Sequence, residues 1–160
     1  MLSGLMCGCI YQDDLERCEG ENGEILFFEY FGDGTQDIFQ DKIEEVTLYI
    51  YDNSDDSLVE TIILSSEQLR QQKVVLDLPP GSYHAVAWGN YLAETHAENT
   101  TSVSTAVLGV SGYFRDERVT TNDSLYFGRT DFTIPASGTV TSPVDFSSAH
   151  IKMVLDPADL

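Results

Sequence analysis

Side chains able to do chemistry are few in this sequence, and the cysteines are the first to consider. Three cysteines occur in 160 residues, and two of them, Cys7 and Cys9, lie within the first nine. Two thiols alone do not supply the four ligands of a structural metal site. Covalent modification of one thiol is the other chemistry available, and a lipid-modified cysteine near an N-terminus holds a protein at a membrane.

The residues around Cys9 resemble a bacterial lipobox, in which apolar residues and one small residue precede the modified cysteine. Gly8 supplies the small side chain before Cys9, whereas the residue before Cys7 is Met6. We therefore expect lipid on Cys9. Residues 1–8 are apolar but too short for a complete signal peptide, so we expect them to be its remnant, with the true start codon upstream. The alternative is a chain with two unmodified thiols.

Residues 9–23 are expected to form a lipidated linker. The acidic segment after Cys9, residues 10–14, resembles the export signal that sends Bacteroidetes lipoproteins to the cell surface. Cys18 is left over as an odd cysteine, which in an exported chain indicates a disulfide partner outside the visible sequence. A free thiol in a flexible segment is the alternative.

The remaining polar residues do not form a recognisable catalytic or metal site. His84, His96 and His150 are far apart in the sequence and lack ligand spacing. The chain contains no nucleophile elbow, zinc-protease motif, phosphate-binding glycine loop or Cys-X-X-Cys pair. The acidic stretch 52–56 begins like a calcium loop but lacks the glycine and glutamate that an EF-hand needs at its sixth and twelfth positions. We predict no enzyme, no cofactor and no metal.

Charge narrows the classes of partner. The chain has 27 acidic and 8 basic residues, a net charge of −19 at pH 7. Such a surface repels the phosphates of nucleic acid and the anionic lipids of a membrane surface. No apolar stretch reaches the roughly 18 residues of a membrane-spanning helix. Attachment to a membrane would therefore depend on lipid.

Short alternating runs of apolar and polar residues predict an all-β fold, a sandwich of about seven strands. The expected strands are residues 24–31, 46–52, 58–64, 73–78, 82–89, 125–134 and 150–156. Ser65 followed by helix-forming residues predicts one short helix over residues 65–72. Pro79-Pro80-Gly81 predicts a sharp hairpin. Residues 93–123 read as long loops, with room for a short helix or strand.

Four stretches of the sequence resemble the fimbrillin-A-associated anchor proteins of Bacteroidales, which are accessory subunits of type V pili. They are CIYQDDLERC, the aromatic strand ILFFEYF, the strand VTLYIYD, and LDLPPGSYHAVAWGN, which matches the family signature LPxGxYxxxAWG. The resemblance implies a transthyretin-like sandwich over residues 24–160, corresponding to the family's N-terminal domain without its second domain. Within the signature, we expect Trp88 to pack in the core or at its edge. The alternative is a binding role for Trp88.

The same resemblance implies a function. It indicates an outer-membrane lipoprotein, exposed at the cell surface, that anchors a fimbria and limits its length through edge-strand contacts with the fimbrial shaft and accessory subunits. A pilin of this class loses its first strand by cleavage at a basic residue after that strand. Here no Lys or Arg lies between Cys18 and Asp41, and Lys42 directly precedes the second strand. We therefore expect an anchor that keeps its first strand.

Two alternatives stay open. One is a glycan- or ligand-binding surface lipoprotein, for which aromatic residues would form an exposed patch, and the other is a fimbrial tip subunit. The candidates for the patch are Tyr49, Tyr51, Tyr91, Tyr113 and Phe114.

Two serines are candidate sites of modification. Ser57 and Ser124 each follow an aspartate and precede a leucine, a pattern used for O-glycosylation in Bacteroidetes. Both are expected in turns, where an enzyme has access.

Overall fold

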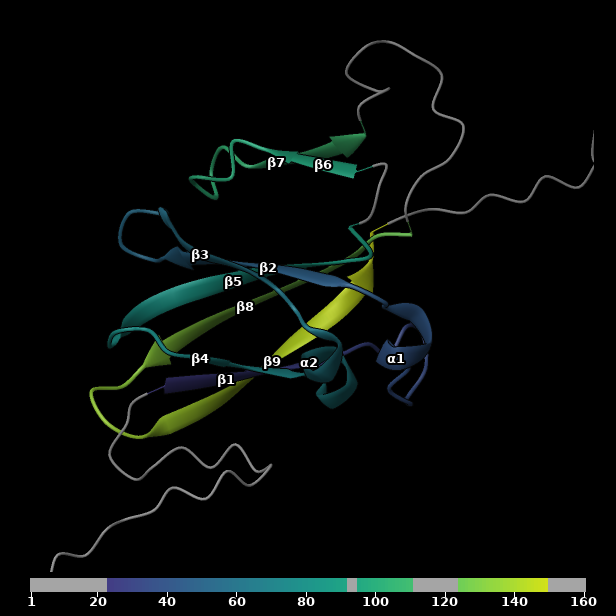
Figure 1. Cartoon of the computed structure of the whole chain (residues 1–160), viewed down its shortest axis with the longest axis horizontal. Helices are drawn as coiled ribbons and strands as arrows, with labels where there is room; N and C mark the ends of the chain where they lie inside the picture. Colours follow the sequence, from purple (N-terminus) through teal and green to yellow (C-terminus); the bar gives the residue numbers. More distant parts are fainter. Residues whose placement is uncertain (1–22, 92–94, 111–123, 150–160) are drawn as a thin grey trace, which may run out of the picture.

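The computed structural model describes residues 23–91, 95–110 and 124–149, which form strands and two short helices (Figure 1). The strands are β1 (Gly23–Glu29), β2 (Val46–Asp52), β3 (Leu58–Ile63), β4 (Lys73–Leu76), β5 (Gly81–Gly89), β6 (Thr95–Glu98), β7 (Val107–Val110), β8 (Tyr126–Ile134) and β9 (Thr139–Ser148). The helices are α1 (Phe39–Lys42) and α2 (Ser66–Gln71). Within this part of the chain, seven strands form one sheet in the order β3-β2-β5-β8-β9-β1-β4, and β6 pairs with β7. The predicted all-β fold is confirmed, and its transthyretin-like detail stays a prediction.

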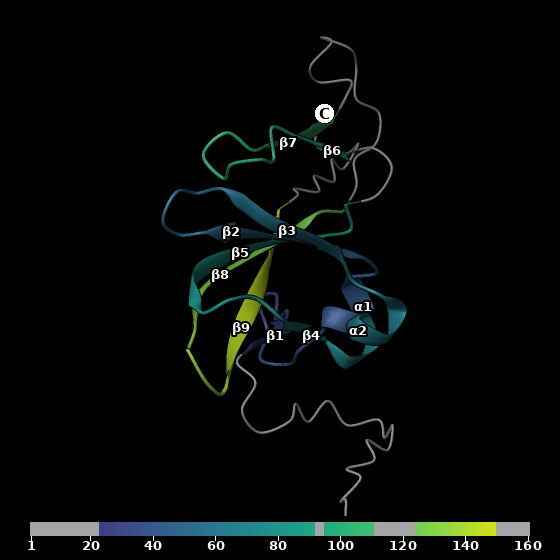
Figure 2. The same cartoon turned by 60° about the vertical axis from the view of Figure 1, so that its left-hand side comes forward.

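The sheet curls into two layers because β8 and β9 pair along only part of their length. Their ladder joins residues 126–128 of β8 to residues 146–148 of β9. Beyond it, β8 follows β5 in the layer β3-β2-β5-β8, and β9 runs parallel to β1 in the layer β9-β1-β4 (Figure 2). Gly128 lies where the strands part, and a Cβ there would stand 2.7 Å from Cγ1 of Val144. The close approach of the two strands therefore requires glycine.

The space between the layers holds the hydrophobic core. Leu26 of β1 and Leu48 of β2 enter it from opposite layers, and both are completely buried. Phe28 of β1, Phe39 of α1 and Phe146 of β9 pack together with ring centroids 5.7 to 6.2 Å apart. Full burial of such a side chain contributes about 1.5–3 kcal/mol. Both layers and the short helix α1 thus contribute side chains to the core.

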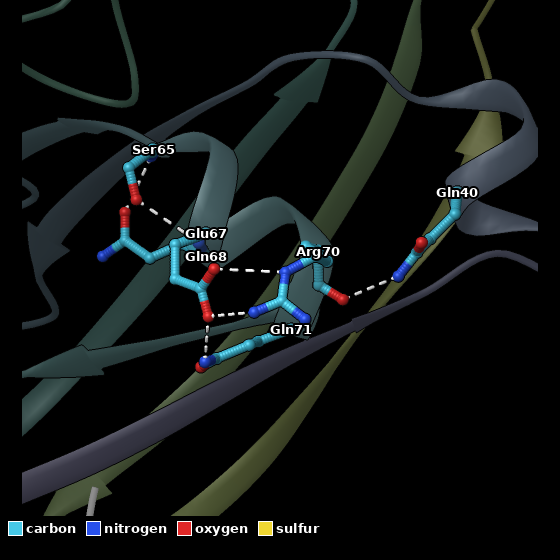
Figure 3. Close-up of polar contacts among 6 residues, drawn as sticks. All are labelled: Gln40, Ser65, Glu67, Gln68, Arg70 and Gln71. Carbon is cyan, nitrogen blue, oxygen red and sulfur yellow. Dashed lines mark hydrogen bonds and ion pairs between the residues drawn. The ribbon is translucent and has the colours of Figure 1, made fainter. Parts of the chain in front are cut away.

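Polar contacts fix the two helices at one end of the sandwich (Figures 1 and 2). Ser65 caps α2, since its hydroxyl accepts from the Gln68 N–H and its own N–H donates to the Gln68 side chain. Arg70 pairs with Glu67 in the same helix, and Gln40 of α1 donates to the Arg70 carbonyl at 2.7 Å (Figure 3). The predicted helix with its serine cap is confirmed, and α1 is an element that the sequence pattern does not show.

A buried asparagine, Asn90, fastens the segment before β2 to the end of β5. Its backbone is left-handed, with a φ of 56°, and its N–H donates to the carbonyl of Glu45. Its side-chain oxygen accepts from the Glu44 N–H at 2.8 Å, and its side-chain nitrogen donates to the Lys42 carbonyl at 2.9 Å. Asparagine tolerates this backbone conformation better than most residues. One side chain therefore ends β5 and positions the start of β2.

Pro79-Pro80-Gly81 connects the two layers and does not form the predicted hairpin. β4 pairs with β1, whereas β5 pairs with β2 and β8, so the chain crosses between layers at this point. The Tyr83 hydroxyl donates to the Pro79 carbonyl at 2.9 Å and holds the corner. The prediction was wrong because a hairpin and a crossover leave the same pattern of apolar and turn residues.

β9 is a strand that the sequence pattern does not reveal. It contains Pro143, and proline is normally confined to edge strands because it lacks an N–H. In this sheet Pro143 lies opposite Phe27 of β1. β9 pairs with β8 only at residues 146–148, so Pro143 has no β8 residue opposite it. Val144 and Phe146, which follow it, are buried in the core. The closing strand predicted at residues 150–156 lies outside the described residues.

Replacing Asn90 by alanine should lower the free energy of unfolding by about 2–4 kcal/mol, because two partly buried hydrogen bonds are lost and two backbone groups lose their partner. Urea unfolding measures the change. Asn99→Ala is the matched control, since Asn99 has a similar φ of 55° but an exposed side chain. Equal destabilisation by the two variants would show that the loss of stability comes from backbone conformation alone and not from the side-chain hydrogen bonds of Asn90.

Candidate functional site

The outer edge of β3 is an open edge of the sheet, with few hydrogen-bond partners for its backbone among the described residues. β3 is the last strand of its layer, and among the described residues its outer side is paired only at its start, where the Leu58 N–H donates to the Thr101 carbonyl. Val59 and Ile63 are exposed apolar residues of this strand, Ile63 to 67%. Edge strands are usually protected by proline, by several charges or by a cover. β3 carries a single charge, Glu60, and is therefore suited to pair with a further strand.

The register identifies the backbone groups that are available. The Leu64 N–H donates to the Val46 carbonyl, so Val46 and Leu64 form a hydrogen-bonded pair of the antiparallel β2–β3 ladder. Alternate residues of β3 then turn their backbone groups away from β2. Thr61 and Ile63 are these residues. An incoming strand would thus meet two free N–H and C=O groups beside an exposed isoleucine.

The first strand is fully integrated into the opposite layer. β1 pairs in parallel with β9 along its whole length and antiparallel with β4 over four positions. Its residues Leu26 and Phe28 are completely buried. The chain therefore supplies its own strand at this place, and the described structure has no open groove where β1 lies.

β1 also carries a buried acid, Glu24, in phase with its two core residues. Glu24 is completely buried and lies opposite Leu76 of β4 and Val140 of β9. Neither of its carboxyl oxygens has a hydrogen-bond partner among the residues described. Burial raises the pKa of Glu24. Burial therefore keeps this acid uncharged up to a higher pH than an exposed glutamate.

The tyrosines of β2 are covered and do not form the exposed aromatic patch that the alternative of a glycan- or ligand-binding protein would need. Tyr49 and Tyr51 do lie on the outer face of their layer, yet only 8% and 2% of their surface is exposed. The cover is the β6–β7 hairpin, which both views place over this face (Figures 1 and 2). Part of the segment expected to be long loops thus forms a small sheet. Tyr113 and Phe114 lie outside the described residues, and Tyr91 is half-buried.

Trp88 shares this outer face and does not enter the main core. It is half-buried, its ring lies 5.0 Å from that of Phe127, and the core positions of β5 belong to Tyr83, Ala85 and Ala87. The expectation that Trp88 packs in the core or at its edge was wrong, because alternation along β5 turns it away from the space between the layers.

Hydrogen bonds attach the hairpin to its neighbours. Within β6, the Ala97 N–H donates to the Tyr91 hydroxyl at 2.7 Å. At its tip, residues 101–103 bond the turn between β2 and β3, and Ser57 forms a β-bridge with Ser102. Between these two attachments a cavity of about 200 Å³ remains over the aromatic face.

The predicted modification sites fall in different places. Cys9 and Cys18 lie outside the described residues, so lipidation and the disulfide stay predictions. Ser57 is half-buried beside its bridge to Ser102, whereas Ser124 is exposed just before β8. Glycosylation of either serine also stays a prediction, and access is better at Ser124.

The two described histidines lie in different surroundings. His84 is buried beside Tyr51, with its Nδ1 atom 2.5 Å from Oδ1 of Asn53, whereas His96 is exposed on β6 and His150 lies outside the described residues. The part of the chain that the structure describes contains no group of three or more His, Cys, Asp or Glu residues arranged to hold a metal. None of its helices is long and apolar enough to cross a membrane.

Comparisons with known proteins agree with this geometry. Residues 15–155 match the family of fimbrillin-A associated anchor proteins Mfa1 and Mfa2. No curated protein sequence matches the chain.

Solved structures share the fold at low sequence identity. One is a candidate adhesin from Bacteroides thetaiotaomicron, with a TM-score of 0.67 and 23% identity over 84% of this chain and 47% of that one. A candidate polysaccharide-binding protein from the same organism has a TM-score of 0.68 and 15% identity over 79% and 47%. The fimbrial anchor protein Mfa2 from Porphyromonas gingivalis has a TM-score of 0.61 and 12% identity over 79% and 50%. The chain spans about half the length of these structures.

The buried acid predicts an unusual pH dependence. Because its pKa is raised on folding, Glu24 contributes most to stability below the ordinary carboxyl pKa, and this contribution is lost as the pH rises through the folded pKa. Each unit of the rise is equivalent to about 1.4 kcal/mol. Glu24→Gln should therefore stabilise the protein at neutral pH and reduce the fall in the free energy of unfolding as the pH rises.

Urea unfolding at a series of pH values from acid to neutral measures this effect. Glu29→Gln removes a carboxylate from the same strand at a half-buried position and serves as the control for net charge. If Glu24→Gln leaves the pH profile of the wild-type protein unchanged, the acid does not titrate as its burial requires.

Proposed function

The chain belongs to the family of fimbrillin-A associated anchor proteins, and from this premise we propose that it is an accessory subunit that holds a fimbria at the bacterial outer membrane. The match over residues 15–155 is the observation that carries the proposal, and the shared fold of the Porphyromonas gingivalis anchor protein supports it. The role is structural: the subunit acts by binding and not by catalysis.

Lipid on Cys9 is the proposed link to the membrane. Residues 10–22 separate Cys9 from the first described strand. The lipobox-like sequence supports this attachment, and lipid is needed because the net charge of −19 opposes electrostatic binding to anionic lipids. Multiple acyl chains on one cysteine give a firm hold, since each buried CH₂ contributes about 0.8 kcal/mol.

The open edge of β3 is the proposed contact with the fimbria. Strand addition at such an edge gains backbone hydrogen bonds, and exposed side chains such as Ile63 contribute apolar contact. The integrated β1 supports a terminal role: a subunit that already contains its own strand offers no groove there for the strand of a neighbour. A fimbria that meets this subunit would end at it, which is how we propose that its length is limited.

The lipid link predicts a clear effect of one substitution. Cys9→Ala should move the protein from the outer-membrane fraction to soluble fractions and release fimbriae into the medium, because the acyl chains are lost. Cell fractionation with immunoblotting measures both. Cys7→Ala is the matched control, since Cys7 would be removed with the signal. Retention of the Cys9→Ala protein in the membrane fraction would refute the lipid link.

The β3 contact predicts a separate effect. Ile63→Lys should leave the subunit folded and membrane-bound, because this side chain is already 67% exposed, but should reduce fimbriae on the cell several-fold by placing a charge on the pairing edge. Thr139→Lys, at an exposed position of β9, controls for the charge change. Shed and cell-attached fimbriae are compared by immunoblot. Equal attachment in the two variants would exclude β3 as the contact.

A further inference from the structure

The sheet face beneath the β6–β7 hairpin is an ordered set of three rows. The register of β2, β5 and β8 places Thr47, Trp88 and Phe127 in one row and Tyr49, Val86 and Arg129 in the next. The third row contains Tyr51, His84 and Asp131. Because residues directly opposite each other share a face, these side chains all project toward the hairpin.

The hairpin does not fill the space over these rows. The cavity of about 200 Å³ has a floor of aromatic residues and Val86, and its roof is mostly aliphatic. The roof residues are Ala97, Thr100, Val103, Ala106, Val107 and Leu108. Drug-sized ligands occupy cavities of about 300–1,000 Å³, so the guest here is limited to a side chain or a short acyl chain.

One charged residue lines this apolar space. Arg129 borders the cavity, and no Asp or Glu is among the described lining residues. Its Nη2 atom is 3.6 Å from Oδ1 of Asp131, and both side chains are more than half exposed, so this pair is weak and can yield to another anion. Tyr49 adds no charge, because its pKa is raised to about 12. Burial is the main cause, and the nearby Tyr91 and Tyr51 add to it.

We propose that this cavity binds an amphiphilic carboxylate, whose apolar part enters between the sheet and the hairpin while its anionic end pairs with Arg129. The aromatic floor and aliphatic roof exclude a strongly polar guest, because a buried hydroxyl would find few partners there. The guanidinium favours a carboxylate over a neutral or cationic end, since an arginine donates two parallel hydrogen bonds to it. The site is independent of the proposed fimbrial role.

Two sources supply this chemistry. A fatty acid presents an acyl chain with a carboxylate, and a peptide that ends in an apolar residue presents a side chain beside its C-terminal carboxylate. Octanoate represents the first and N-acetyl-leucine the second. The control compounds, which lack the negative charge, are octylamine for octanoate and N-acetyl-leucinamide for N-acetyl-leucine.

Trp88 provides the readout, because it lines the cavity and is the chain's single tryptophan. Titration of the full chain with octanoate or N-acetyl-leucine should give a saturable change in tryptophan fluorescence. The uncharged or cationic partner should bind about tenfold more weakly or not at all. A response to one carboxylate only supports the site and identifies the source.

Three variants make the test specific to the cavity. Arg129→Gln should weaken binding about tenfold, whereas Arg70→Gln, the same charge change on α2, should not. Ala97→Leu should narrow the cavity and abolish binding, with urea unfolding confirming that the variant is folded. The proposal is overturned if octylamine binds as well as octanoate, if both arginine variants behave alike, or if neither carboxylate gives a saturable change.

Discussion

The parallel pairing of β1 with β9 is the interaction on which the two-layer core depends. β4 joins its layer through β1, so without β1 the layer would retain only β9. Leu26 and Phe28 would leave the core with it, and Phe28 is one of three phenylalanines that pack together there. Such a loss exceeds what a domain with a typical net stability of about 5–15 kcal/mol tolerates. Retention of β1 is thus a condition of the fold, and it agrees with a subunit that receives no strand at this place.

Much of this arrangement follows from alternation in the sequence. The pattern in residues 46–52 correctly separates Leu48 from Tyr49, and Ser65 marks the start of α2. Glu24 could have been found in the same way, because it lies two residues before Leu26 on the same face of the strand. A charged residue in phase with a hydrophobic stripe is the available signal, although only the structure shows that its carboxyl group lacks a partner among the described residues.

Other features depend on contacts between distant residues, which a local pattern does not contain. β9 is hidden because Pro143 argues against a central strand, and only the separation of β8 from β9 makes it acceptable. Asn90 reads as a polar turn residue, yet its function is to hold residues 42–45. The tyrosines of β2 read as exposed because their cover comes from a segment about fifty residues later, whose apolar runs are short.

The two layers differ in how their exposed faces and edges are completed. Without a cover, Tyr49, Trp88 and Phe127 would add an apolar patch to the surface, and such patches promote association. The hairpin covers this face and leaves a cavity beneath it. Within the layer itself, the open edge among the described residues is β3. β1, the first described strand after Cys9, lies in the other layer, so the strand nearest in sequence to the proposed lipid link and the proposed fimbrial contact belong to different layers.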